Sequence, residues 1–316
     1  MPSLTQMKYI VSVFENKSFS LASKECHVSQ PSLSMQIQKA EDELAVTIFD
    51  RNSKPISVTD KGLKLVQQMK IILNESKRLS DLSKIQAGTL SGQIDLAVIP
   101  TVAPYLLPLI LNPIAQDMPH VQVNIFEQTT SEILQNLKSK ELDAAILATP
   151  LNEDDLIESP LYYEPFYVLA HKTHPILKNK VVREQDMAKF PIWLLDEGHC
   201  FRTQTLSVCS PRPRQDVFAN VKYAGGSIHT LMQIVLESEG CTLIPHLALK
   251  DLSPNIIKTH VRPLKKPTPS REISLVMHKS QWKTDVLSRI KALTLQTMDK
   301  ELLRPHGLEV LEIENR

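Results

Sequence analysis

Two cysteines nine positions apart, Cys200 and Cys209, are the residues of this sequence best suited to chemistry. An apolar run at residues 191–195 precedes them and predicts a buried strand, followed by a turn and then a helix. Cys200 falls in the first turn of that helix, where free backbone N–H groups and the helix dipole favour a thiolate. His199 and Arg202 are expected to add positive charge nearby.

The spacing of the two cysteines predicts a conformational constraint. If the segment is helical throughout, nine residues place the second cysteine half a turn off the face of the first and about 13 Å along the axis. A disulfide needs Cα atoms within about 7 Å, so a bond between them requires the segment to refold. A pair of this kind acts as a switch; the alternative is two unrelated buried thiols.

Length and composition predict a multidomain protein without a membrane span. The chain has 316 residues, which suits two or three domains, and an apolar fraction of 42%. No apolar run approaches 18 residues, and the first residues lack the apolar stretch of a secretory signal. With 4 cysteines the expected setting is a reducing cytoplasm, in which a disulfide is transient and regulatory.

Neither a cofactor nor a metal is expected. The whole chain contains 8 glycines and no phosphate-binding glycine motif. His171 and His174 lack partners at ligand spacing. Cys26 lies on the inner face of the predicted second helix and Cys241 starts an apolar strand, so both are predicted to be packed structural thiols.

The N-terminal ninety residues carry a mild excess of positive charge, 12 Lys and Arg against 9 Asp and Glu. This excess permits nucleic-acid binding without arguing for it, so the assignment depends on pattern. Apolar residues at helical spacing predict a first helix over residues 4–14. Ser20 is the predicted cap of a short second helix, and Ser29-Gln30-Pro31 begins a third.

The third helix has a predicted buried face and a predicted polar face. Its buried face consists of Leu33, Ile37, Ala40 and Leu44, which leaves outside the residues Ser32, Ser34, Met35, Gln36 and Lys39. A short helix, a tight turn and a polar third helix are typical of a helix-turn-helix, whose second helix enters the DNA major groove. Ser and Gln can bond base edges or phosphates, and Lys39 supplies charge. The alternative is a three-helix cluster with a solvated polar face.

A sequence resemblance favours the DNA-binding interpretation. Five segments follow one another over about sixty residues: Phe19-Ser20-Leu21-Ala22-Ser23, Val28 to Ser34, Glu41 to Leu44, Ile48 to Arg51, and Val58 to Gly62. They resemble the winged helix-turn-helix of LysR-type transcriptional regulators. The resemblance implies that Ser32, Ser34 and Gln36 face the groove and that Lys54-Pro55 lies in the wing beside a phosphate. The sequence departs at Leu44-Ala45, where the family usually has Leu-Gly.

A long helix is predicted from residue 59 or 60 to about residue 86. Its apolar positions, at Val66, Met69, Leu73, Leu79 and Leu82, come close to a coiled-coil seam and predict pairing with a second copy. A dimer presents two recognition helices about one DNA turn apart. The alternative is that the helix packs on its own regulatory domain.

Residues 91 to about 300 alternate strand and helix patterns, with predicted strands that include 166–170, 192–195 and 217–221, and this alternation predicts parallel sheets wound with helices. The predicted organisation is an all-α winged helix-turn-helix domain (1–59), a linker dimerisation helix (60–88) and an α/β regulatory domain (91–304). The last has two doubly wound subdomains, one formed by 91–164 plus 271–304 and the other by 165–270. The family resemblance implies that this part resembles periplasmic binding proteins.

Polar residues follow several predicted strands, where ligands of open α/β sheets bind. They are Thr101, Thr129 and Thr130, the pair His199-Cys200, and Gly225-Gly226-Ser227 before a helix. Each alone is explained as a helix cap. Convergence on one cleft would make them a binding site.

The regulatory half resembles the peroxide-sensing members of the LysR-type family. The matching segments are Ile99 to Pro108, Glu164-Pro165, Gly198 to Arg202 with Cys209, and Thr242 to Pro245. The resemblance implies that hydrogen peroxide oxidises Cys200 to a sulfenic acid, which Cys209 captures as a reversible disulfide. It further implies a peroxide pocket formed by Thr101, Thr130, Gly198, His199 and Arg202. Two prolines in Ser210 to Arg214 depart from the family and forbid a continuing helix.

The sequence therefore predicts a cytoplasmic, DNA-binding transcriptional activator of oxidative-stress genes, not an enzyme. Its implied partners are double-stranded promoter DNA, hydrogen peroxide as effector, further copies of itself as a dimer of dimers, and RNA polymerase. One alternative is a LysR-type regulator that binds a small metabolite in the cleft between the subdomains. Another is a thiol peroxidase, which would have no need of a helix-turn-helix.

Overall fold

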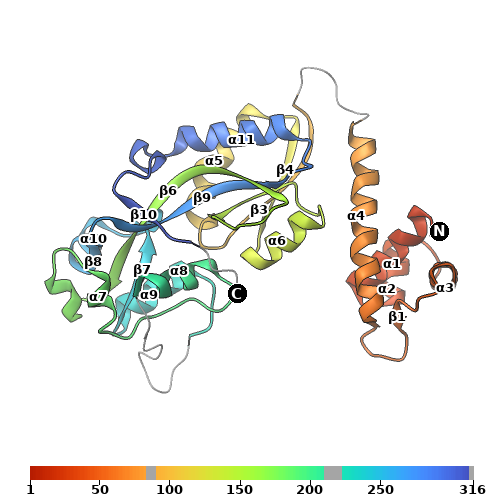
Figure 1. Cartoon of the computed structure of the whole chain (residues 1–316), viewed down its shortest axis with the longest axis horizontal. Helices are drawn as coiled ribbons and strands as arrows, with labels where there is room; N and C mark the ends of the chain where they lie inside the picture. The colour runs from red at the N-terminus through yellow and green to blue at the C-terminus, as the bar shows by residue number, and fades with distance from the viewer. Residues whose placement is uncertain (83–89, 210–222, 313–316) are drawn as a thin grey trace. The chain divides into compact units, whose positions relative to one another are not determined.

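A computed structural model describes residues 1–82, 90–209 and 223–312. The chain divides into two compact units (Figure 1). One consists of residues 1–89 with 138–141, and the other of 90–137 with 142–316. None of the described helices is long and apolar enough to cross a membrane.

The first unit is a helical cluster with a short two-stranded sheet. Its elements are α1 (Leu4–Asn16), α2 (Phe19–Glu25), α3 (Gln30–Leu44), β1 (Phe49–Asp50), β2 (Ser57–Val58) and α4 (Asp60–Leu82). The predicted cap Ser29 accepts a hydrogen bond from the N–H of Ser32, as expected for α3. The predicted cap of α2 was wrong: Ser18 accepts the N–H of Leu21, so the helix begins one residue before Ser20.

The core of this unit confirms the predicted buried face of α3. Leu33, Ile37 and Ala40 are fully buried, and Leu44 packs against them partly buried. Helix α4 contributes its first apolar positions, including Val66, to this same core. The first half of the seam predicted for pairing is thus used inside the unit. Leu79, farther along α4, is 73% exposed.

The second unit is an α/β domain built on one path of strands, β4-β3-β5-β9-β6-β7. The strands are β3 (Gly92–Val98), β4 (Val121–Glu127), β5 (Ala144–Thr149), β6 (Leu156–Ala170), β7 (Cys241–Pro245), β8 (Val261–Pro263), β9 (Thr268–His278) and β10 (Leu308–Val310). The helices are α5 (Ala103–Asp117), α6 (Thr130–Lys138), α7 (Glu184–Met187), α8 (Cys200–Cys209), α9 (Ile228–Glu237), α10 (Pro254–His260) and α11 (Thr284–Thr297), with 3₁₀ turns at Pro175–Lys178, His246–Asp251 and Lys300–Leu303.

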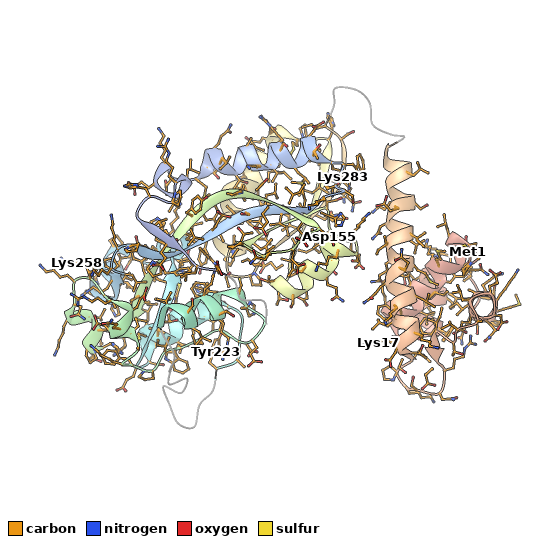
Figure 2. The ribbon with its side chains drawn as sticks, viewed as in Figure 1. Met1, Lys17, Asp155, Tyr223, Lys258 and Lys283 are labelled. Carbon is orange, nitrogen blue, oxygen red and sulfur yellow. The ribbon has the colours of Figure 1, made fainter. Side chains whose placement is uncertain are left out.

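The sheet is mixed rather than wholly parallel. β3 pairs in parallel with β4 and β5, as the alternating pattern predicted. β9 is antiparallel to β5 and β6 and parallel to β10, and β6 is antiparallel to β7; β6 and β9 run through both halves of the unit as long strands. Figure 1 shows α5 and α11 on one side of the β3 half, and α8 and α9 beside the β7 half. Side chains fill the space between these layers (Figure 2).

Two predicted strands differ from the structure. Residues 192–195 form no strand, because only Ile192 makes an isolated bridge, to Cys241. The strand predicted at 166–170 is the end of β6, which begins at Leu156. The strand predicted at 217–221 lies outside the described residues.

Candidate functional site

Cys200 is the first residue of α8, a buried free thiol with 6% of its surface exposed. The same helix ends at Cys209, so the segment between the two cysteines is helical throughout. Nine helical residues separate the two Cα atoms by about 13.5 Å, well beyond disulfide reach. The segment Ser210 to Arg214, with its two prolines, lies outside the described residues.

The electrostatics of Cys200 differ from the expectation. Burial raises the pKa of the thiol above its ordinary value, and this effect exceeds the opposing ones. The Thr130 hydroxyl, the Arg271 guanidinium and backbone N–H groups at the start of α8 all act to lower the pKa. The favourable groups are therefore present, but dehydration of the thiolate outweighs them in this conformation.

The cation that acts on Cys200 is Arg271 on β9, which is fully buried. Its guanidinium donates to Glu164 Oε2 from Nε at 2.9 Å and pairs with it through Nη2 at 2.7 Å. It also donates to the hydroxyl and the carbonyl of Thr101, both at 3.0 Å. Glu164 Oε1 in turn accepts the N–H of Leu247 at 2.7 Å. The ring of Phe201 lies 5.3 Å from the guanidinium carbon, so α8 packs directly against this ion pair.

Several polar atoms near Cys200 are buried without a hydrogen-bond partner among the described residues. The clearest case is Gln204, whose two amide atoms are both unpaired, whereas the buried Thr130 hydroxyl acts on the Cys200 thiol. Gln204 follows Cys200 by four residues, so the side chains of Cys200 and Gln204 lie on one face of α8. Thr130 is the first residue of α6. Unpaired buried polar atoms cost about 1–3 kcal/mol each. The cluster therefore has free capacity to bind a small molecule that both donates and accepts hydrogen bonds.

His199 is half-buried beside this cluster and is not a source of positive charge. Burial lowers the pKa of its imidazole, and Asp196 and Glu132 only partly oppose the shift. The ring lies against Gly226: a Cβ there would lie 2.3 Å from His199 Nε2. Any larger residue at 226 would displace the imidazole.

Gly198 and Arg202 shape the turn that delivers Cys200. Gly198 has φ +90°, a conformation that favours glycine. Arg202 Nη1 donates to the carbonyl of Leu195 at 2.8 Å, which holds the incoming segment to the first turn of α8. Its guanidinium thus braces the turn, whereas Arg271 lowers the pKa of the thiol.

The structure brings Thr101, Thr130 and Cys200 of the predicted pocket together, because Arg271 bonds Thr101 and acts on the Cys200 thiol, and the Thr130 hydroxyl acts on the same thiol. Sequence reasoning missed Arg271, Glu164 and Gln204 as members. Gln204 carried a usable signal, since it lies one helical turn after Cys200. Arg271 lies 71 positions from Cys200 in the sequence. It comes close to the thiol only because β9 passes beside α8 in the folded unit.

The predicted DNA-binding residues lie on α3 and in the β1–β2 connection of the other unit. Ser32 is half-exposed, and Lys39 and Lys54 are exposed. Gln36 is held by Gln6 of α1, whose Nε2 donates to Gln36 Oε1 at 3.2 Å. Ser34 Oγ accepts from Arg51 Nη1 at 3.1 Å.

Arg51 connects the end of β1 to α3. Its Nη2 pairs at 3.0 Å with Glu41, which is 4% exposed and also accepts the N–H groups of Ile48 and Phe49. The guanidinium carbon lies 5.3 Å from the Phe19 ring centre. The start of the β1–β2 connection is therefore fixed to α3 by a buried carboxylate.

The remaining cysteines lie apart from this chemistry. Cys241 is fully buried in β7, and Cys26 is half-buried at the end of α2. In the described part of the chain no three His, Cys, Asp or Glu side chains are grouped so that they could hold a metal ion.

Comparison with known proteins assigns both units. Residues 4–63 match the bacterial regulatory helix-turn-helix of the lysR family, and residues 87–299 match the LysR substrate binding domain. The chain belongs to the LysR family. This LysR-family protein is accordingly a transcription regulator and not an enzyme.

Two relatives that are similar over most of the chain are named as transcriptional regulators. The chain is 34% identical over 274 residues to the hydrogen peroxide-inducible genes activator of Pectobacterium carotovorum, covering 87% of this chain and 89% of the relative. It is also 34% identical over 274 residues to the DNA-binding transcriptional dual regulator OxyR of Escherichia coli, with 87% and 88% coverage.

Solved OxyR structures match both units. A full-length OxyR variant from Pseudomonas aeruginosa superposes with a TM-score of 0.72 at 28% identity, covering 93% of this chain and 98% of that one. A hydrogen-peroxide-bound OxyR variant from Corynebacterium glutamicum gives a TM-score of 0.59 at 28% identity, with 94% coverage of each chain. The LysR-family protein described here thus resembles OxyR in sequence and in fold.

Proposed function

We propose that this protein is a transcriptional activator that senses hydrogen peroxide through oxidation of Cys200 and reversible disulfide formation with Cys209, and controls oxidative-stress genes. One observation carries the proposal. Cys200 is buried at the start of α8 beside Arg271 and unpartnered polar atoms, and Cys209 ends the same helix. The names of the relatives supply independent support.

The chemistry has two balanced steps. The Cys200 thiolate attacks one peroxide oxygen, the O–O bond breaks, and the second oxygen leaves as hydroxide that takes up a proton to become water. Cys200 is now a sulfenic acid. The Cys209 thiolate then attacks that sulfur, forms the S–S bond and releases a second water. A dithiol reductant returns both thiols.

The pocket residues have different roles in these steps. Arg271 lowers the pKa of the attacking thiol, and its two hydrogen bonds hold Thr101 in place. Gln204 has the free donor and acceptor that a peroxide molecule needs, and the Thr130 hydroxyl acts on the Cys200 thiol itself. Gly198, His199 and Arg202 form the turn that presents Cys200, and we include them in the pocket on that ground.

The covalent step drives a change of conformation because α8 keeps the two cysteines too far apart to bond. Oxidation favours whichever arrangement lets the sulfurs meet, and reduction favours α8. One bond thereby biases a two-state element. The alternation of these two states is the proposed signal.

We further propose that the signal acts on promoter DNA through residues 1–59, with Ser32, Ser34, Gln36, Lys39 and Lys54 at the interface. Residues 60–88 would pair protomers, and residues 91–304 would sense peroxide, in the subdomains 91–164 plus 271–304 and 165–270. A cytoplasmic dimer of dimers that recruits RNA polymerase completes the proposal.

The deciding experiment counts thiols in the denatured protein before and after one equivalent of hydrogen peroxide, with peptide mapping of any bridge. The expected result is the loss of two thiols, mapped to Cys200 and Cys209 and restored by a dithiol. Variants Cys26→Ser and Cys241→Ser serve as matched controls and should oxidise normally. The Cys200→Ser variant should bind DNA yet ignore peroxide.

Loss of a single thiol, or no loss, would contradict the switch. In that case a regulator that binds a small metabolite in its cleft becomes the better proposal. Thermal stabilisation of Cys200→Ser protein by candidate metabolites would then support it, because the ligand would bind without the thiol.

A further inference from the structure

The outward face of α3 has an apolar side chain at its centre. Met35 lies two residues from both Leu33 and Ile37, the fully buried positions of the helix, and so about 200° of helical rotation from each. It is 63% exposed, whereas Leu33 and Ile37 are fully buried. Met35 therefore points directly away from the core of its unit.

The polar residues on either side of Met35 are partly occupied. Ser34 accepts a hydrogen bond from Arg51, and Gln36 accepts one from the buried Gln6. These contacts fix both side chains against their own unit. Met35 is exposed beside them and has no strong hydrogen-bonding group to satisfy, so its apolar end is free to contact a partner.

Charge indicates which part of this face can approach DNA. Farther along α3 the outward positions include Asp42, a carboxylate that accepts from Gln38 at 3.0 Å and would repel phosphates. The first half of the helix, residues 30–37, has the positive end of the dipole and no carboxylate, and the exposed Lys39 lies one helical turn beyond Met35. The half that suits DNA is thus the half centred on Met35.

A thioether at that position has one natural partner in the major groove. Methionine offers no strong donor or acceptor to the polar edges of bases, whereas thymine presents an apolar C5-methyl group there. Contact between them buries apolar surface on both sides. Cytosine, lacking the methyl group, would leave Met35 unmatched.

We propose that Met35 is a specificity-determining residue that recognises the C5-methyl group of a thymine in each half-site. This inference rests on the proposed DNA-binding function and names the base that the function would select. Ser32 and Lys39, on the same face, supply hydrogen bonds and phosphate attraction around this contact.

The test uses the full-length protein and duplex DNA. Selection from a randomised duplex library first yields the bound sequence, and each thymine is then replaced by uracil, which lacks only the methyl group, symmetrically in both half-sites. One such replacement should weaken wild-type binding by about fourfold per half-site, the ratio expected for one buried methyl group. Met35→Ala should bind the thymine and uracil duplexes equally.

Three control variants separate this contact from general binding. Met35→Leu should keep a preference for thymine, since leucine is also apolar. Leu21→Ala removes another exposed apolar side chain, on α2, and should leave the preference unchanged. Lys39→Ala should weaken both duplexes alike and flatten the salt dependence of binding.

The outcomes are distinguishable. If no sequence is enriched and no duplex binds, the proposed DNA-binding function itself fails. If wild-type protein binds a selected sequence but no thymine-to-uracil replacement matters, or Met35→Ala retains the preference, the inference about Met35 is overturned while the function stands.

Discussion

At the scale of single residues, Arg271 and Arg202 make different contributions to the chemistry of Cys200. Arg271 is buried, paired with Glu164, and lowers the pKa of the thiol, whereas Arg202 holds the carbonyl of Leu195. The sequence alone indicated Arg202 as the source of positive charge near Cys200, because it lies two positions from the cysteine. The three-dimensional path of β9 gives the electrostatic role to the more distant arginine.

The first prediction concerns Arg271→Met, made together with Glu164→Gln so that no buried charge is left unpaired. Loss of the cation should raise the pKa of Cys200 further and slow its oxidation at neutral pH, about tenfold for each unit of pKa. The measurement is the rate of Cys200 alkylation and peroxide oxidation as a function of pH, followed by mass spectrometry. The whole profile should move to higher pH.

Arg202→Met is the matched control, and it should leave the pH profile in place while loosening the turn before α8. A profile that moved equally in both variants would contradict the assignment of the electrostatic role to Arg271. Glu164→Gln alone reports whether the ion pair is needed to position the guanidinium.

The same pKa shift predicts the pH dependence of stability. Folding raises the pKa of Cys200, so the folded state holds this proton more tightly than the unfolded state. The resulting contribution to the free energy of unfolding is complete below the pKa of the unfolded thiol and is lost as pH rises through the folded one. Urea unfolding of wild-type and Cys200→Ser protein between pH 7 and 10 measures this, and only the wild type should show the loss.

Among the secondary-structure elements, α8 is the one that must change during the proposed switch. Its ten residues hold Cys200 and Cys209 at opposite ends. Ser207 is an exposed residue of this helix whose hydroxyl donates to the carbonyl of Gln204. Substitution there alters helix stability without entering the pocket.

Disulfide formation should therefore depend on the helix propensity at position 207. Alanine stabilises an exposed helical position by about 1 kcal/mol over glycine, so Ser207→Ala should form the bridge about fivefold more slowly than Ser207→Gly. Rapid quench with mass spectrometry separates this step from sulfenic acid formation, whose rate should be the same in both. Equal bridging rates would show that α8 does not limit the reaction.

Helix α3 ends at a residue that strains it. Ala45 has φ +53°, in the left-handed region, while its N–H closes the helix by donating to the carbonyls of Asp42 and Glu41. Glycine adopts this conformation without a steric penalty. LysR-type regulators usually have glycine at this position, where this chain has alanine.

Ala45→Gly should accordingly stabilise the first unit by about 1 kcal/mol. Thermal or urea unfolding of the full-length protein, followed at the transition of the N-terminal unit, is the measurement. Lys140→Gly, at another left-handed residue with φ +60°, offers a comparison in a different loop. No gain from Ala45→Gly would mean that the C-cap carries no strain.

Periodicity predicted most helices to within a few residues because their apolar stripes repeat regularly. It failed where the sequence lacks such a signal. β6 begins ten residues before its predicted start, since Pro160, Glu164 and Pro165 interrupt the apolar pattern that marks a strand. Residues 192–195 are apolar because they are buried, yet they join no ladder beyond one bridge. Burial and strand pairing are separate properties, and composition reports only the first.

At the scale of the whole molecule, the two units separate the proposed sensing chemistry from the proposed DNA contacts. Each described group that acts on the pKa of Cys200 belongs to the larger unit. The core of the N-terminal unit is likewise formed from its own helices. The described surroundings of Cys200 thus lie within the larger unit, and the core that supports α3 lies within the N-terminal unit.

This division predicts that a fragment of residues 90–316 oxidises at nearly the full-length rate. Arg271, Glu164 and Thr130 all remain in the fragment with their partners, so the second-order rate constant for peroxide and the extent of Cys200–Cys209 bridging should agree within about twofold. Stopped-flow mixing with thiol mapping measures both quantities. A large loss of rate in a fragment that remains folded by circular dichroism would show that the N-terminal unit shapes the pocket. Sensing would then depend on the arrangement of the two units, and DNA binding would shift the equilibrium between the thiol and disulfide forms by the same factor by which oxidation changes DNA affinity, because coupling between sites is reciprocal at equilibrium.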